Sequence, residues 1–75
     1  PLGDLVDVEK ELSRLTKDRD ATARDIARGE AMLKNEGFLS KAPAQLIETE
    51  KGKLETARKT LETLEARIKE IEALR

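Results

Sequence analysis

The chain has 75 residues, of which 41% are charged, 37% are hydrophobic and only one, Phe38, is aromatic. It contains neither cysteine nor histidine, which excludes disulfide scaffolds, cysteine-based zinc sites and catalytic units built on a histidine base. Its net charge is −1, from 15 basic and 16 acidic residues, and no apolar run approaches the roughly 20 residues of a membrane span. A composition rich in Ala, Glu, Lys, Leu and Arg indicates long solvated helices.

The first predicted helix covers residues 4–36. Asp4 is predicted to cap its N-terminus, with Asp7 as a weaker capping-box partner. Gly37 is predicted to follow the last turn in the left-handed conformation. For about four heptads, seam residues recur at alternating steps of three and four, as at the a and d positions of a coiled coil. These residues are Leu5, Val8, Leu12, Leu15, Arg19, Thr22, Ile26, Gly29 and Leu33.

The second predicted helix covers residues 43–75, and residues 37–42 are predicted to form a loop before it. Pro43 has no amide hydrogen and a preset φ, so it suits the first helical position. The heptad spacing returns at Ile47, Glu50, Leu54, Ala57, Leu61, Leu64, Ile68, Ile71 and Arg75. A loop this short permits only an antiparallel hairpin. The predicted fold is therefore all-α, one domain forming an antiparallel two-helix coiled-coil hairpin over residues 1–75.

The heptads also predict a register, because a positions of one helix meet d positions of the other in an antiparallel pair. The predicted seam pairs are Ile26–Ala57, Gly29–Leu54, Thr22–Leu61 and Leu15–Ile68. A slip of one helical turn stays open. On one flank of the seam, the acidic residues predicted to face Lys53 and Arg67 are Asp4, Glu11, Asp18 and Asp25. On the other flank, Glu30 is predicted to pair with Lys51.

Acidic pairs such as Asp18 with Asp20 raise the question of acid–base or metal chemistry. A two-helix hairpin offers no concave pocket that would raise a carboxylate pKa or exclude water, so these pairs are interpreted as solvated helix faces. The chain also has no phosphate-binding loop and no dinucleotide fingerprint. We therefore expect no catalytic residue, no metal and no cofactor in this segment.

Charge is unevenly distributed along the predicted hairpin. Residues 1–13 and 62–75, at its open end, hold 4 basic and 8 acidic residues, whereas residues 14–61 hold 11 basic and 8 acidic. One outward stripe of the first helix carries Lys10, Arg14, Lys17, Arg24 and Arg28. A basic stripe along a rod suits contact with a phosphate backbone, and solubilising charge with i,i+4 partners is the alternative. The candidate RNA-binding residues are Arg14, Lys17, Arg24, Arg28, Lys34 and Lys41.

Three further residues each have two interpretations. Arg19, in the seam, either packs its stem and extends its guanidinium to water, or it sets the register or contacts RNA. Gly29, which costs roughly 1 kcal/mol relative to alanine inside a helix, allows either close packing or a bend toward a ligand. Phe38 either folds back over the apolar residues of the tip or stacks on an exposed base pair or ribose. Gly37, Phe38 and Pro43 are the residues predicted to shape the hairpin tip.

Two segments resemble valyl-tRNA synthetases. The opening of the chain, PLGDLVDVEKE at residues 1–11, resembles the passage by which that family enters its C-terminal coiled coil. The break LKNEGFLSKAP at residues 33–43 resembles the family's hairpin, in which a Leu-x-Asn-x-x-Phe-x-x-x-Ala-Pro pattern recurs. The polar and small seam residues from Arg19 to Gly29 depart from the more regular members, and they predict local asymmetry there.

The resemblance covers essentially the whole chain and implies the tRNA-binding arm of a longer, cytoplasmic class I aminoacyl-tRNA synthetase. It implies an arm that reaches the outer corner of tRNA(Val), where the D and T loops meet, and positions the tRNA for aminoacylation and editing. Valine, ATP and the zinc of some members would belong to other domains of the parent enzyme. The implied partners are tRNA(Val) and the rest of the parent synthetase, without a membrane and with the segment itself a monomer. A structural coiled coil that self-associates is the alternative.

Overall fold

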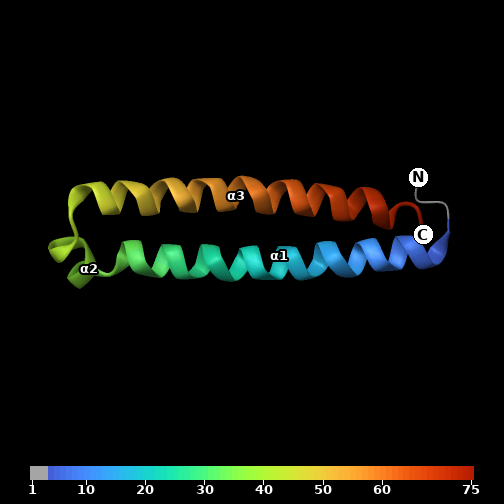
Figure 1. Cartoon of the computed structure of the whole chain (residues 1–75), viewed down its shortest axis with the longest axis horizontal. Helices are drawn as coiled ribbons and strands as arrows, with labels where there is room; N and C mark the ends of the chain where they lie inside the picture. The colour runs from blue at the N-terminus through green and yellow to red at the C-terminus, as the bar shows by residue number, and fades with distance from the viewer. Residues whose placement is uncertain (1–3) are drawn as a thin grey trace.

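The computed structural model describes residues 4–75 as three helices, α1 (Leu5–Lys34), α2 (Glu36–Lys41) and α3 (Ala44–Glu72). The two long helices lie antiparallel and side by side, and α2 closes one end of the pair (Figure 1). The described residues include no strand. The molecule measures 53 × 14 × 13 Å, with a radius of gyration of 16.7 Å, against about 11 Å for a compact chain of this length. The predicted all-α hairpin is confirmed.

The start of α1 matches its predicted cap. Asp4 has an extended backbone, and its Oδ1 accepts a hydrogen bond of 2.9 Å from the amide of Asp7. This bond satisfies one of the free amides at the helix start, and the carboxylate faces the positive end of the helix dipole. Residues 1–3, which open the first family-like segment, lie outside the described range.

The tip differs from the predicted loop, because residues 36–41 form a short helix. Asn35 separates α1 from α2. Its backbone amide donates to the carbonyl oxygen of Met32 at 3.2 Å, and its side-chain Oδ1 accepts from the backbone amide of Phe38 at 3.2 Å. The left-handed conformation predicted for Gly37 is wrong, since no described glycine has a positive φ. A Cβ at Gly37 would instead lie 3.1 Å from Asn35 Oδ1. Glycine therefore fits because the capping side chain approaches so closely.

Pro43 also sits one position earlier than predicted. It precedes α3 as its N-terminal cap residue, with φ −59° and ψ 146°, whereas the sequence placed it at the first helical position. Its ring still fixes the chain direction at the start of the helix. Its carbonyl oxygen accepts from the amides of Leu46 and Ile47 at 3.0 and 3.2 Å.

The seam between α1 and α3 follows the predicted heptads. Near the open end the hydrophobic residues form one buried cluster, with Leu64 packed against it; its members are Val8, Leu12, Leu15, Ile68 and Ile71. Nearer the tip, Leu54 is the one buried residue among the described seam positions, and the other interior positions are half-buried. The base of the hairpin is thus packed more tightly than its outer part. None of the described helices is long and apolar enough to cross a membrane.

One layer of the seam confirms the predicted register, because a Cβ at Gly29 would lie 3.3 Å from Leu54 Cδ1. Leu15 and Ile68, a second predicted pair, belong to the same buried cluster. Two ion pairs also cross the seam: Arg58 Nη2 lies 2.9 Å from Glu30 Oε2, and Arg75 Nη2 lies 2.9 Å from Glu9 Oε1.

The predicted pairing of Glu30 with Lys51 is wrong, because Lys51 Nζ lies 3.6 Å from Glu48 instead. Side chains lean toward the N-terminus of their own helix. Glu30 of α1 therefore leans toward the open end and Arg58 of α3 leans toward the tip, so that the two converge. Lys51 begins nearer the tip and leans farther from Glu30.

Candidate nucleic-acid interface

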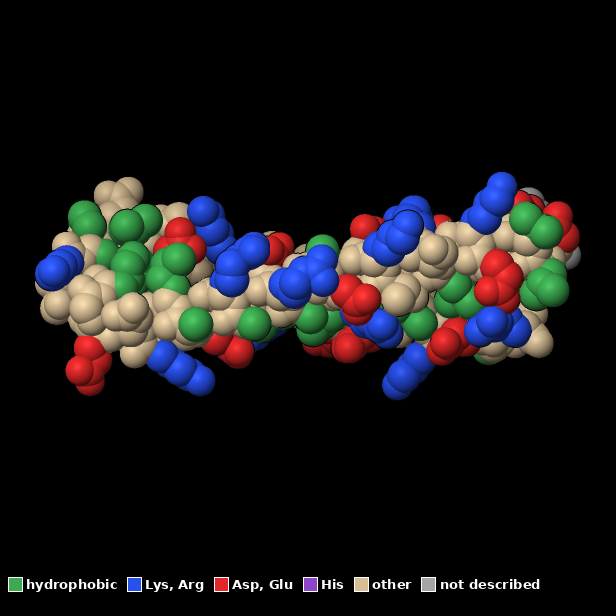
Figure 2. Space-filling model, turned by 90° about the horizontal axis from the view of Figure 1, so that it is seen from below, with side chains coloured by type: hydrophobic (Ala, Val, Ile, Leu, Met, Phe, Trp, Pro, Cys, Tyr) green, Lys and Arg blue, Asp and Glu red, His purple; other side chains and the backbone are tan. Residues whose placement is uncertain are grey.

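Basic side chains project from the rod along its length, as one face shows in Figure 2. Ion pairs divide them into two groups. Eight have an acidic partner within 4.0 Å: Arg14, Arg19, Arg28, Lys51, Lys53, Arg58, Arg67 and Arg75. Within residues 4–75 the other basic residues form no ion pair and are all exposed: Lys10, Lys17, Arg24, Lys34, Lys41, Lys59 and Lys69. Charge that is free to meet an external anion therefore resides in this second group.

The six candidate RNA-binding residues fall on both sides of this division. Four of them are exposed and without an ion pair among the described residues: Lys17, Arg24, Lys34 and Lys41. Arg14 instead donates to both carboxylate oxygens of Glu11 at 2.8 and 2.9 Å, and to Asp18 at 3.3 Å. Arg28 is paired with Asp25 one turn before it. The guanidinium groups of these two arginines are therefore already bound to neighbouring acids of α1.

The pairing of Arg14 with Glu11 shifts the pKa values of both side chains. Hydrogen bonds from Arg14 hold the pKa of Glu11 below its ordinary value, and the charges of Arg14 and Arg67 lower it further. The same hydrogen bonds raise the pKa of Arg14. Both groups are therefore charged at neutral pH and satisfy each other on the surface of α1.

Arg19 packs along the seam, as the first of its two interpretations predicted. Its side chain is 37% exposed, and its Nε and Nη2 each lie 3.2 Å from Asp20 Oδ1. It lines a groove beside Ile68 of the opposite helix. The stem thus covers the seam while the guanidinium reaches the surface and an acidic neighbour.

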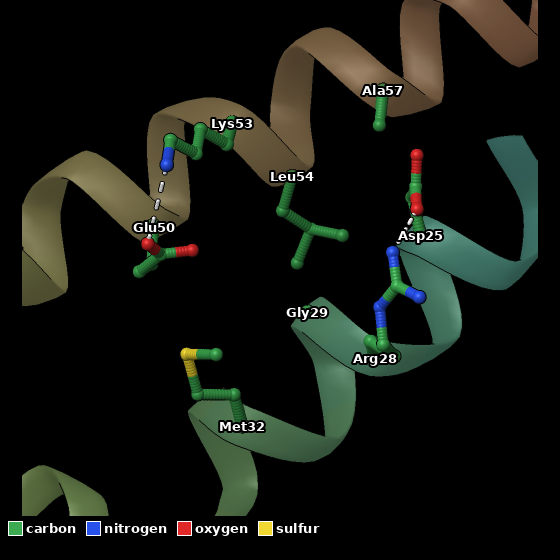
Figure 3. Close-up of a pocket in the computed structure, with 8 residues that line it drawn as sticks. All are labelled: Asp25, Arg28, Gly29, Met32, Glu50, Lys53, Leu54 and Ala57. Atoms are coloured by element: carbon green, nitrogen blue, oxygen red, sulfur yellow. Dashed lines mark hydrogen bonds and ion pairs between the residues drawn. The ribbon is translucent and has the colours of Figure 1, made fainter.

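A shallow groove crosses the seam where glycine leaves room for the opposite helix (Figure 3). Its lining residues are Asp25, Arg28, Gly29, Met32, Glu50, Lys53, Leu54 and Ala57. Arg28 pairs with Asp25 on α1, and Lys53 Nζ lies 3.5 Å from Glu50 on α3. The charges around the groove are thus neutralised within each helix, and its floor is filled by Leu54 pointing at Gly29.

The tip presents an apolar surface whose exposure the sequence did not predict. Met32, Leu39 and Leu46 are 37%, 38% and 42% exposed, whereas Phe38 is half-buried. Hydrophobic side chains gather at the α2 end of the face seen in Figure 2. The signal was available for Met32 and Leu46, because both occupy heptad positions that flank the seam.

A thin helical rod with paired charges along its seam, unpaired cations outside it and an apolar tip has the form of a binding arm. Among residues 4–75 no group of three or more acidic side chains is placed to hold a metal ion. The fold and surface thus define the chain as a helical-hairpin arm with exposed cations on its outer faces.

A family model described as the valyl tRNA synthetase tRNA binding arm matches residues 7–72, and the chain belongs to this family. The valine–tRNA ligase of Clostridium perfringens is 47% identical over 74 residues, covering 99% of this chain and 8% of that protein. That of Clostridium acetobutylicum is 46% identical over 68 residues, covering 91% of this chain and 8% of the relative. The chain therefore spans about a twelfth of these relatives. No solved structure matches it.

Proposed function

We propose that this chain is the arm by which a cytoplasmic valine–tRNA ligase holds tRNA(Val) at its elbow, the corner where the D and T loops meet. The arm would position the tRNA for aminoacylation and editing by the rest of the enzyme, without a cofactor of its own. The observation that carries the proposal is the set of exposed, unpaired cations on a rod that matches a tRNA-binding arm.

The mechanism is electrostatic. Lysine and arginine side chains that neutralise phosphates release counterions, which gives affinity and orientation without reading the base sequence. The candidate residues are Arg14, Lys17, Arg24, Arg28, Lys34 and Lys41. Four of these form no ion pair with any described residue, so their charge is available to phosphates. The apolar tip residues Met32, Leu39 and Leu46 suit contact with an unstacked base or a ribose.

Deletion of the arm tests the proposal. The full-length ligase and a variant lacking residues 4–75 are titrated with tRNA(Val) over a series of salt concentrations. The deletion is expected to weaken binding and to make the logarithm of affinity depend less steeply on the logarithm of salt concentration. Valine activation in the absence of tRNA serves as the control for an intact catalytic domain. Unchanged tRNA affinity at every salt concentration would overturn the proposal.

A second titration tests the elbow. A tRNA(Val) whose D and T loops no longer pair with each other is expected to bind the full-length and the deleted enzyme equally. If the arm still improves the binding of this altered tRNA by the same factor, the arm contacts another part of the molecule.

A further inference from the structure

Three of the unpaired cations occupy one line along α1. Lys10, Lys17 and Arg24 are separated by seven residues each, and all three are exposed. They share the heptad position that points directly away from α3. Seven residues of α-helix rise about 10.5 Å, so the line spans about 21 Å from its first to its last member. We call these three residues the outer row of α1.

Four carboxylates near this row are held by arginines of α1. Glu11 and Asp18 are held by Arg14, Asp20 by Arg19, and Asp25 by Arg28. Glu9 and Glu30 pair instead with Arg75 and Arg58, and Asp7, one turn before Lys10, forms no ion pair among residues 4–75. The outer row itself forms no ion pair within the described residues. Its positive charge is therefore directed to solvent.

The outer face of α3 is different. Its corresponding heptad positions hold Gln45, Gly52, Lys59 and Ala66, so only one of the four is charged. Most other cations of α3 pair with acids, as Lys53 does with Glu50 and Arg67 with Glu70. Lys59 and Lys69 are the only cations of α3 that lack an ion pair in the described chain, and they are ten residues apart. Although the net charge of the rod is near zero, the outer face of α1 thus carries more unpaired positive charge within residues 4–75 than the outer face of α3.

We propose that the outer row of α1, formed by Lys10, Lys17 and Arg24, contacts the sugar–phosphate backbone of the tRNA, and that α3 faces away from it. This inference rests on the proposed function and adds the face of the rod that the RNA approaches. It also adds Lys10 to the interface, and it removes Arg14 and Arg28 from direct phosphate contact. A row of point charges at regular steps matches the repeating charge of a polyanion, which requires no base-specific geometry.

The test compares matched variants of the full-length ligase. Lys10→Ala, Lys17→Ala and Arg24→Ala remove the outer row one charge at a time. Lys59→Ala and Lys69→Ala remove charges from α3 that are also exposed and form no ion pair among the described residues. Alanine is the best helix former, so no variant is expected to unfold the arm, and circular dichroism checks this. Each outer-row variant is expected to weaken tRNA binding several-fold and to reduce the salt slope by about 1, whereas the α3 variants leave the slope unchanged.

The outcomes separate the two proposals. If deletion of the whole arm changes nothing, the proposed function fails and this inference fails with it. If the deletion weakens binding but Lys59→Ala or Lys69→Ala reduces the slope as much as the outer-row variants do, the arm binds tRNA and the assignment of the face is overturned. Lys34→Ala and Lys41→Ala are measured as well. If these two variants alone reduce the salt slope, the assignment is also overturned, because contact would then be confined to the tip.

Discussion

Gly29 and Leu54 show what a single small residue does in this seam. Leu54 is 8% exposed, and its side chain lies where a Cβ at position 29 would approach it at 3.3 Å. The atom approached is the end of a flexible side chain, which can shift by a few tenths of an ångström. Gly52, on the outer face of α3, has nothing within 4 Å of its Cβ position. The two glycines therefore differ only in what stands opposite them.

Replacing each of these two glycines with alanine distinguishes the effect of helix propensity on stability from the effect of packing against the opposite helix. Gly52→Ala is expected to raise the free energy of unfolding by about 1 kcal/mol, the usual difference between glycine and alanine in a helix. Gly29→Ala is expected to stabilise less, because Leu54 must move aside. Denaturant unfolding of both variants measures the difference. An equal gain at both sites would show that Leu54 does not restrain position 29.

The Glu11–Arg14 pair predicts a pH dependence. The pKa of Glu11 is lowered in the folded state, so its contribution to stability is complete above the unfolded value of about 4.3 and is lost as the pH falls through the lowered value. Glu11→Gln is therefore expected to be less stable than the parent chain at neutral pH, with the gap closing in acid. Thermal unfolding of both chains at about pH 7 and about pH 3 measures it. A gap that stays constant would contradict the assignment.

At the scale of the elements, α2 depends on Asn35. This residue ends α1 through its amide and begins α2 through its side chain. Asn35→Ala is expected to cost about 1 kcal/mol, the usual effect of losing an N-cap side chain. Asn35→Asp is the control, since it keeps the acceptor oxygen. Faster hydrogen exchange at the amide of Phe38 in the alanine variant alone would localise the loss, and an unchanged exchange rate there would contradict it.

The seam of α1 and α3 predicts unequal local stability. The buried cluster lies near the open end, whereas Thr22, Ile26 and Gly29 of α1 are only half-buried. Local opening requires less free energy where fewer apolar contacts are broken. Amides near Leu12 and Ile71 are therefore expected to exchange slowest. Thr22→Val, which adds an apolar group to the weaker half, is expected to slow exchange there, and uniform protection along both helices would contradict the gradient.

The sequence predicted the elements better than the connections between them. Heptad spacing and the Asp4 cap depend on residues near in sequence, and the structure confirms both. The conformation of Gly37 depended on a competing hydrogen bond from the backbone amide of Phe38 to Asn35 Oδ1, which composition does not reveal. The partner of Glu30 depended on the direction in which side chains lean across the seam.

The candidate interface was predictable in the same limited way. Charge counting identified the more basic, tip-proximal part of the hairpin and a basic stripe on the first helix. It could not tell Arg14, which is occupied by two acids, from Lys17, which has no ion pair in the described chain. That distinction requires distances between side chains, because both residues lie within a turn of an acid in sequence.

At the scale of the whole molecule, the hairpin closes within one chain. Cross-seam pairs such as Glu30–Arg58 and Glu9–Arg75 join residues of the same molecule. We expect the isolated arm to sediment as a monomer at tens of micromolar, with a radius of gyration in scattering near the 16.7 Å of its Cα atoms. A helix-swapped dimer would have to straighten the tip and lose the Asn35 caps. A markedly larger radius with twice the mass would contradict the monomer.

The shape of the rod has a mechanical consequence. α1 begins and α3 ends at the same end of a body 53 Å long, so the tip is held only through the two helices (Figure 1). A rod that is held at the end carrying both chain ends acts as a lever, in which a rotation of a few degrees at the held end displaces the other end by several ångströms. A small change in angle there would thus be amplified at the tip while both helices stay intact.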